Sequence, residues 1–272
     1  APGAMATTMK PLLNDFKSAL RTLEANNKDA GALKKGAATL TKIKIAMLEF
    51  DATTTMETDM KAAKEQLLLS REALELATLY SATIRDIDSF KRHIAQVQLY
   101  YRDYSDVILE SARKWMILGL NLMHLLAESK LSEFHTELEL IPLEARKDIY
   151  ISYPIEVEQR LMEGSYSKVR KAREKIPSDY YIYFMDTLVD TVRERISECS
   201  MKAYKSVPFK EAKTLLLLDT DEKIKAYAQK RGWSIESGEI HWNQKVESKL
   251  ELKSKDLIEE SLGFATELER IV

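Results

Sequence analysis

The residues whose types and spacing come closest to a chemical site are His135 and Glu139, four positions apart in a predicted helical segment. Two side chains at this spacing share one helix face, as a pair of zinc ligands must. No second pair lies nearby, and the sequence contains no H-E-x-x-H, C-x-x-C, G-x-S-x-G or glycine-rich phosphate-loop motif. His124, inside an apolar run, is better interpreted as a core histidine. We therefore expect no enzyme, no catalytic or metal site, no cofactor and no small-molecule substrate.

Composition gives little indication of a charged partner or a membrane. Lys plus Arg number 41 and Asp plus Glu number 43, so bulk charge predicts no polyanionic ligand. The most apolar run, residues 115–127, is shorter than the roughly 20 residues that cross a bilayer, and we expect no membrane span. The single cysteine, Cys199, cannot form an intrachain disulfide, which fits a reducing compartment, and its helical surroundings favour a buried structural thiol.

Hydrophobic residues recur at helical spacing through residues 6–178. Leu12, Phe16, Leu20 and Leu23 form the first such stripe, and no proline interrupts the chain between Pro11 and Pro142. Shorter helices are expected over 131–140, 154–163 and 166–175. Consecutive helical pairs without β signals predict a right-handed α-solenoid, whose helices contact mainly their sequence neighbours and form an extended recognition surface.

The pattern changes in residues 179–244. A long helix over 179–204 is followed by an apolar stretch over 212–218, a helix over 221–231 and then two alternating runs around Ser237-Gly238. The two runs predict a β-hairpin in which Trp233 faces Trp242 and Ile235 faces Ile240. Three helical segments followed by a hairpin are typical of a winged-helix module. The predicted fold class is thus all-α with a small β-hairpin.

A winged helix can serve two kinds of partner. Lys223, Lys225, Lys230 and Arg231 could contact nucleic-acid phosphates, but several carboxylates in the helix, before it and in the hairpin oppose a polyanion. The alternative is protein assembly, because the edge strand of such a sheet can accept a strand from a neighbour. Assembly fits the charges better, and it makes these hairpin residues candidate partner contacts: Trp233, Ile235, Ile240 and Trp242.

Residues 245–272 are predicted to form a polar linker and a final amphipathic helix over 255–272. Its apolar stripe needs a surface to pack against and runs to the last residues. This pattern favours an intermolecular helix bundle, and the alternative is a helix that folds back on its own winged helix. The candidate bundle contacts are Leu257, Ile258, Leu262, Phe264, Leu268 and Ile271.

A group of tyrosines between residues 100 and 183 admits two interpretations. Tyrosine buries area while it keeps a polar tip, so these residues could be interface anchors or could serve packing between helices. They are Tyr100, Tyr101, Tyr104, Tyr150, Tyr153, Tyr166, Tyr180, Tyr181 and Tyr183.

Several segments resemble a known family. They are Gly119–Leu126, Glu133–Glu139, Pro154–Tyr166, Ile176–Tyr180, Asp190–Arg193, Ala226–Trp233 and Glu267–Val272. Together they resemble the PCI-domain subunits of the 26S proteasome lid from about Leu67 onward. The first 60 or so residues match loosely, and 234–254 differ from the family pattern. Residues 1–5 look like an expression scar.

The resemblance implies a noncatalytic scaffold in the cytoplasm and nucleus that supports ubiquitin-dependent protein degradation. It implies helical repeats, a winged helix whose sheet edge joins other PCI subunits of the lid, and a C-terminal helix that enters a bundle with them. Through the assembled lid, the partners would include the proteasome base. The COP9 signalosome and the translation initiation factor three complex use the same fold, so membership of either is an alternative.

Overall fold

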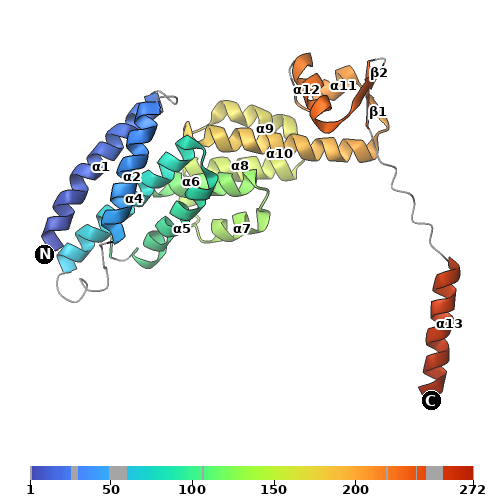
Figure 1. The fold of residues 1–272 in the computed structure, drawn as a ribbon, viewed down its shortest axis with the longest axis horizontal. Coiled ribbons are helices and arrows are strands. Elements are labelled where there is room, and N and C mark those ends of the chain that lie inside the picture. The colour runs from blue at the N-terminus through green and yellow to red at the C-terminus, as the bar shows by residue number, and fades with distance from the viewer. Residues whose placement is uncertain are drawn as a thin grey trace. The chain divides into compact units, whose positions relative to one another are not determined.

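The computed structural model describes residues 2–25, 30–48, 60–105, 107–218, 220–236, 238–242 and 254–271 (Figure 1). The described residues are mostly helical, with one small sheet, as predicted. The α-helices are α1 (Pro2–Ala25), α2 (Ala30–Leu48), α4 (Met60–Ile84), α5 (Ile87–Asp103), α6 (Lys114–Ala127), α7 (Leu131–Glu139), α8 (Ile149–Met162), α9 (Tyr166–Ala172), α10 (Tyr180–Ala203), α11 (Phe209–Leu215), α12 (Asp221–Arg231) and α13 (Ser254–Ile271). The 3₁₀ turns are η1 (Ala145–Lys147) and η2 (Arg173–Lys175), and the strands are β1 (Ser206–Pro208), β2 (Ser234–Glu236) and β3 (Glu239–His241).

The chain forms two compact units, Ala1–Glu194 and Arg195–Val272, which divide within α10. The start of α10 buries Tyr181 and Phe184 in the first unit, whereas Ile196 near its end packs against the core of the second. The predicted domain boundary at residues 178 and 179 coincides with the start of this helix. Pro177 and Ser178 mark the start of this helix in the sequence. They do not show that the one helix supplies residues to two cores, which is why the boundary of the compact units lies further along it.

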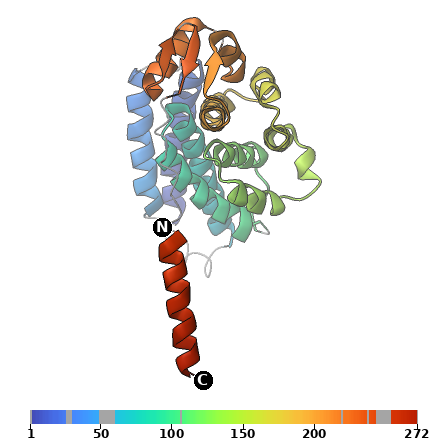
Figure 2. The ribbon, with the colours of Figure 1, turned by 90° about the vertical axis from the view of Figure 1, so that its right-hand side faces the viewer.

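In the first unit, most helices pack against their neighbours in sequence. Helix α1 packs against α2 and α4, α4 against α5, and α6 against α7 and α8. The predicted stripe of α1 is buried at Phe16, Leu20 and Leu23, and the Phe16 ring lies 5.3 Å from that of Tyr80 in α4. Helices α9 and α10 run across Figure 1 and are seen nearly end on in Figure 2, whereas α1 and α2 stay upright. The helix direction therefore changes along the unit.

Helix α8 begins five residues before the predicted start at Pro154. Asp148 caps it by accepting a hydrogen bond from the Tyr150 N–H at 2.9 Å, and Pro154 lies inside the helix. Proline removes one helical hydrogen bond, here the bond that would reach the Tyr150 carbonyl. The Tyr181 hydroxyl of α10 donates to that carbonyl instead, at 3.3 Å. The prediction of a helix start at Pro154 was wrong because a contact distant in sequence compensates for the proline.

In the second unit, α11 and α12 pack on a three-stranded antiparallel sheet of order β1-β3-β2. The register pairs Ile235 with Ile240, as predicted, and the Trp233 and Trp242 rings lie 4.4 Å apart. Strand β1 was not predicted, and it pairs with β3 on the other side. A three-residue strand that ends in proline carries too little periodicity to be recognised. The core of this unit comprises Val207, Ala212, Leu216, Leu218, Ile224, Ala228, Trp233, Ile240 and Trp242.

One predicted burial is wrong. Cys199 is exposed, whereas Ser197 and Ser200 on the same helix are buried. The face of α10 that packs inward is therefore set by its neighbours, and it is not the face that carries the thiol. Across the described residues, no helix combines the length and apolar character that a bilayer-spanning segment needs.

Candidate assembly interfaces

Helix α13 carries an apolar face that no described residue covers. Five large apolar side chains are between 49% and 69% exposed, namely those of Leu257, Ile258, Leu262, Phe264 and Leu268. The side chain of Ile271, the sixth predicted contact, lies outside the described residues. Water around these side chains costs free energy that burial would recover, at about 1.5 to 3 kcal/mol for each fully buried Leu, Ile or Phe. The face has the properties of an unfilled helix-packing surface.

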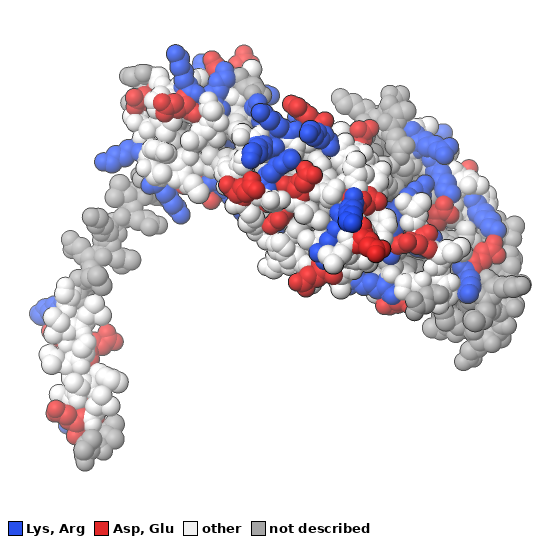
Figure 3. All heavy atoms as spheres, turned by 180° about the vertical axis from the view of Figure 1, so that it is seen from behind, with Lys and Arg blue, Asp and Glu red and all other residues white. Residues whose placement is uncertain are grey.

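Several polar side chains of α13 have partners within the helix itself. Ser261 and Thr266 donate hydrogen bonds to their own helix's carbonyls, and Lys255 pairs with Glu259 four residues on. In Figure 3 the surface of this helix is mostly uncharged, with acidic groups near its two ends. The exposed apolar side chains of this mostly uncharged surface favour an apolar helix partner over a charged one.

The second candidate interface is the edge of the three-stranded sheet. In the order β1-β3-β2, strand β2 is outermost, and its outer backbone groups pair with no described strand. Ile235 on this strand is 39% exposed, whereas Trp233, Ile240 and Trp242 are buried in the core. Of the four predicted contact residues, Ile235 is therefore the one available to a partner. Any strand added here would be held mainly by backbone hydrogen bonds.

Helix α12 carries acidic residues at its start and basic residues along the rest of its length. Asp221 and Glu222 occupy the first turn, and Asp221 pairs with Lys213 of α11 at 3.0 Å. The guanidinium of Arg231 lies over the ring of Tyr227. Over most of the face drawn in Figure 3, Lys and Arg alternate with Asp and Glu. The helix therefore presents mixed charge, which does not favour a phosphate backbone.

The histidines do not form a metal site among the described residues. His135 lies 3.5 Å from Glu158 of α8, and no group of three potential ligand side chains occurs in that part of the chain. His124 is buried between Phe90 and Phe184, with ring centroids 5.5 and 5.6 Å away. Burial lowers the pKa of His124 from its usual value, although Glu128 opposes this effect. This environment matches the predicted core histidine.

Two members of the tyrosine group, Tyr153 and Tyr181, are buried and serve packing between helices. Tyr181 is buried, and its hydroxyl reaches the carbonyls of Met116 and Tyr150 on two other helices. Tyr153 donates to the Ala172 carbonyl and thus connects α8 with α9. Burial raises the pKa of both phenols, so they act as neutral hydrogen-bond donors.

Comparison with known proteins agrees with this arrangement. The model of the CSN8/PSMD8/EIF3K family matches residues 113–251, slightly more than half of the chain. The chain belongs to the CSN8/PSMD8/EIF3K family. The matched region runs from the first turn of α6 through the three-stranded sheet, so it includes one of the two candidate interfaces.

Relatives in this family cover most of the chain. The 26S proteasome non-ATPase regulatory subunit 8 homolog A of Arabidopsis thaliana is 35% identical over 86% of this chain and 89% of its own length. The 26S proteasome non-ATPase regulatory subunit 8 of Caenorhabditis elegans is 32% identical over 94% and 98%. The 26S proteasome regulatory subunit rpn12 of Schizosaccharomyces pombe is 34% identical over 72% of each. These matches confirm the family indicated by the sequence motifs.

Proposed function

We propose that this chain is a noncatalytic assembly subunit of the lid of the 26S proteasome regulatory particle, which supports ubiquitin-dependent protein degradation by holding neighbouring subunits. The observation that carries the proposal is the uncovered apolar face of α13 on a chain whose relatives are regulatory subunits of that particle. A surface suited to another helix, together with relatives that are named as regulatory subunits of the proteasome, favours the same role.

In this proposal the two units have separate tasks. The helices of the first unit form a degenerate α-solenoid, and α11, α12 and the sheet form the winged helix of a PCI module. The outer strand β2 accepts a strand from another PCI subunit, with Ile235 as its side-chain contact. Holding neighbouring subunits in this way needs no catalytic residue.

Helix α13 then enters a helix bundle with other lid subunits. Its stripe of Leu257, Phe264 and Leu268 repeats at the spacing with which helices pack side by side. Burial of several such side chains gives enough free energy to offset part of the entropy lost on association. Through the completed lid the chain would contact the proteasome base, in the cytoplasm and the nucleus.

The bundle role is tested by Leu268→Asp in the full chain. A carboxylate at a desolvated helix contact has no compensating partner, so we expect the variant to fold but to lose incorporation into the lid by at least tenfold. The measurement is affinity purification from cells followed by quantitative mass spectrometry of lid and base subunits.

The matched control is Thr266→Asp, which places the same charge on the polar side of the same helix and should leave incorporation unchanged. A truncation without residues 255–272 should behave like Leu268→Asp. Normal incorporation of Leu268→Asp would show that α13 is not the bundle contact.

The same purification distinguishes the family alternatives. Recovery of COP9 signalosome or translation initiation factor three subunits in place of lid subunits would transfer the assembly role to that complex. If no assembly is recovered, duplex DNA binding should be measured against salt concentration, with Lys223, Lys225, Lys230 and Arg231 neutralised. We expect no such binding at physiological salt.

A further inference from the structure

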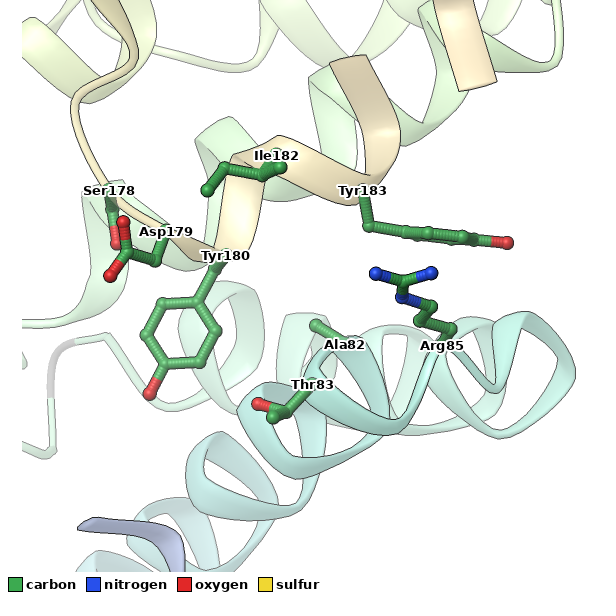
Figure 4. A pocket seen from close by; sticks show the side chains of 8 residues that line it. All are labelled: Ala82, Thr83, Arg85, Ser178, Asp179, Tyr180, Ile182 and Tyr183. Atoms are coloured by element: carbon green, nitrogen blue, oxygen red, sulfur yellow. The ribbon is translucent and has the colours of Figure 1, made fainter. Parts of the chain in front are cut away.

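A surface pocket of the first unit lies between the C-terminal end of α4 and the N-terminal end of α10, and none of its lining residues belongs to α13 or to the sheet. It has a volume of about 530 Å³, within the usual range for binding pockets. In Figure 4, Arg85 and Tyr183 form one side and Ser178, Asp179 and Tyr180 the other. Ala82 and Thr83 of α4 lie on the lower side, and Ile182 lies above.

The positive charge in this pocket is the guanidinium of Arg85, and it is available to a ligand. The guanidinium of Arg85 lies 5.4 Å from the centre of the Tyr183 ring. None of the ion pairs found among the described residues includes Arg85, and Figure 4 shows Asp179 on the opposite side of the pocket. A planar guanidinium held against an aromatic ring is oriented for a two-point hydrogen bond to a carboxylate.

The remaining walls suit an apolar side chain. Ile182 is 36% exposed, and the Tyr180 ring lines the pocket beside it. The Thr83 hydroxyl already donates to the Leu79 carbonyl of its own helix, so it does not need a ligand acceptor. Tyrosine and arginine are the side chains enriched at the centre of protein contacts.

The exposure of the walls favours a polypeptide over a metabolite. Small-molecule sites bury most of their ligand between buried groups, but here Arg85 and Asp179 are exposed and the tyrosines are half-buried. A peptide lying across the pocket needs only one charged anchor and one apolar anchor. Opposite charges at the two sides would also set the direction of the peptide.

We propose that this pocket binds a short peptide segment of another polypeptide, in which a Glu or Asp side chain pairs with Arg85 and a neighbouring apolar side chain packs against Tyr180 and Ile182. The proposal rests on the pocket alone and does not depend on the lid assignment. It also gives a role to Ser178, Asp179 and Tyr180, which belong to one of the family-like segments and take no part in α13 or the sheet edge.

The decisive variant is Arg85→Gly. Arg85 has a φ of 67°, the left-handed conformation that ends α4, where glycine is the preferred residue. Glycine should therefore leave the unfolding midpoint unchanged or raise it, while it removes the cation. Arg85→Gln is a second variant that keeps a side chain, and Arg92→Gln on α5 is the matched control that removes another exposed arginine.

The probes are two pools of blocked pentapeptides, with Glu or Gln at the centre and Leu, Tyr, Ala or Ser at the flanks. Binding is followed by the side-chain NMR signal of Arg85 in the full chain labelled with ¹⁵N-arginine, and the signal is assigned by its absence in Arg85→Gly. We expect the Glu pool to shift this signal and the Gln pool not to shift it. Affinity for the Glu pool is compared between variants by isothermal titration calorimetry, which does not depend on the Arg85 signal. It should fall about ten- to a hundred-fold in both Arg85 variants, the range for a lost charged hydrogen bond, and stay unchanged in Arg92→Gln.

Three results would each overturn the proposal. Equal shifts from the Glu and Gln pools, or none from either at millimolar concentration, would show that no carboxylate is recognised here. Equal shifts from acetate or inorganic phosphate would show a site for small anions without a peptide contact. Whether Leu268→Asp loses lid incorporation has no bearing on any of these results. The proposal for the pocket and the proposal for the lid can therefore be refuted independently.

Discussion

The hydroxyl of Tyr181 satisfies a carbonyl that Pro154 leaves without its helical partner. In α8 the residue four positions after Tyr150 is Pro154, which has no N–H to donate. Tyr181 donates to the Tyr150 carbonyl at 3.3 Å and to the Met116 carbonyl at 3.1 Å. A side chain at Gly119 would collide with both Tyr150 and Tyr181, so three helices meet at this point only because residue 119 has no Cβ.

Tyr181→Phe should therefore destabilise the chain through the unpaired Tyr150 carbonyl. We expect a loss of about 1 to 3 kcal/mol in the free energy of unfolding, the cost of a buried acceptor without a donor. Urea denaturation measures it. Tyr204→Phe is the control, because that side chain is 54% exposed, and it should change stability by less than about 0.5 kcal/mol.

A double-mutant cycle identifies the cause. Pro154→Ala restores a backbone N–H for the Tyr150 carbonyl, so in that background Tyr181→Phe should cost less by about 0.5 kcal/mol or more. An equal cost in both backgrounds would mean that the two residues act independently.

At the scale of elements, a buried carboxylate connects α4, α5 and the segment before α6. Glu75 is 2% exposed, and it accepts hydrogen bonds from the Tyr101 hydroxyl at 2.9 Å and the Ser111 hydroxyl at 3.0 Å. Arg71, one turn earlier, lies 3.5 Å from the same carboxylate and also donates to the Leu109 carbonyl. Burial and then Glu75 raise the pKa of Tyr101, which keeps this phenol neutral as a donor.

Glu75→Ala should be strongly destabilising because it leaves the largely buried side chain of Arg71 without its counter-charge. The expected loss is about 3 to 5 kcal/mol in the free energy of unfolding. Glu72→Ala, one turn away, removes a partly exposed ion pair with Lys17 and should cost about 1 kcal/mol or less. Similar losses in the two variants, measured by urea denaturation, would contradict a special role for the Glu75 cluster.

Two of the locally encoded elements match their predictions closely. Helix α12 spans the predicted residues, and α13 is displaced by one residue at each end. Both carry a complete helical pattern that begins after a polar segment, and α12 also ends at a glycine, Gly232. The start of α8 and the strand β1 were missed, because the first depends on Tyr181 and the second on pairing with β3.

At the scale of the whole molecule, the exposed face of α13 should make this helix the least protected described helix of the isolated chain. Helices of this length owe most of their stability to packing, and the described side chains of α13 are exposed. We expect its amides to exchange with deuterium within seconds, whereas those of α6, which is buried along most of its length, exchange far more slowly. Hydrogen-exchange mass spectrometry of the isolated chain measures both.

In the purified lid, the amides of α13 should become protected. Slow exchange of α13 in the isolated chain would instead support the alternative that the helix folds back on its own winged helix. The comparison of free and assembled states thus tests the bundle independently of any substitution.

The sequence by itself determined the helical class, the hairpin register, the α13 stripe and the family, because each is written in the spacing or identity of nearby residues. Tertiary structure decided the exposure of Cys199, the place of Pro154 inside α8, the strand β1 and the position of Arg85 beside Tyr183. These features depend on which faces meet across long stretches of chain. A periodic pattern shows that an element has a buried face, but only its neighbours decide what that face and the opposite face contact.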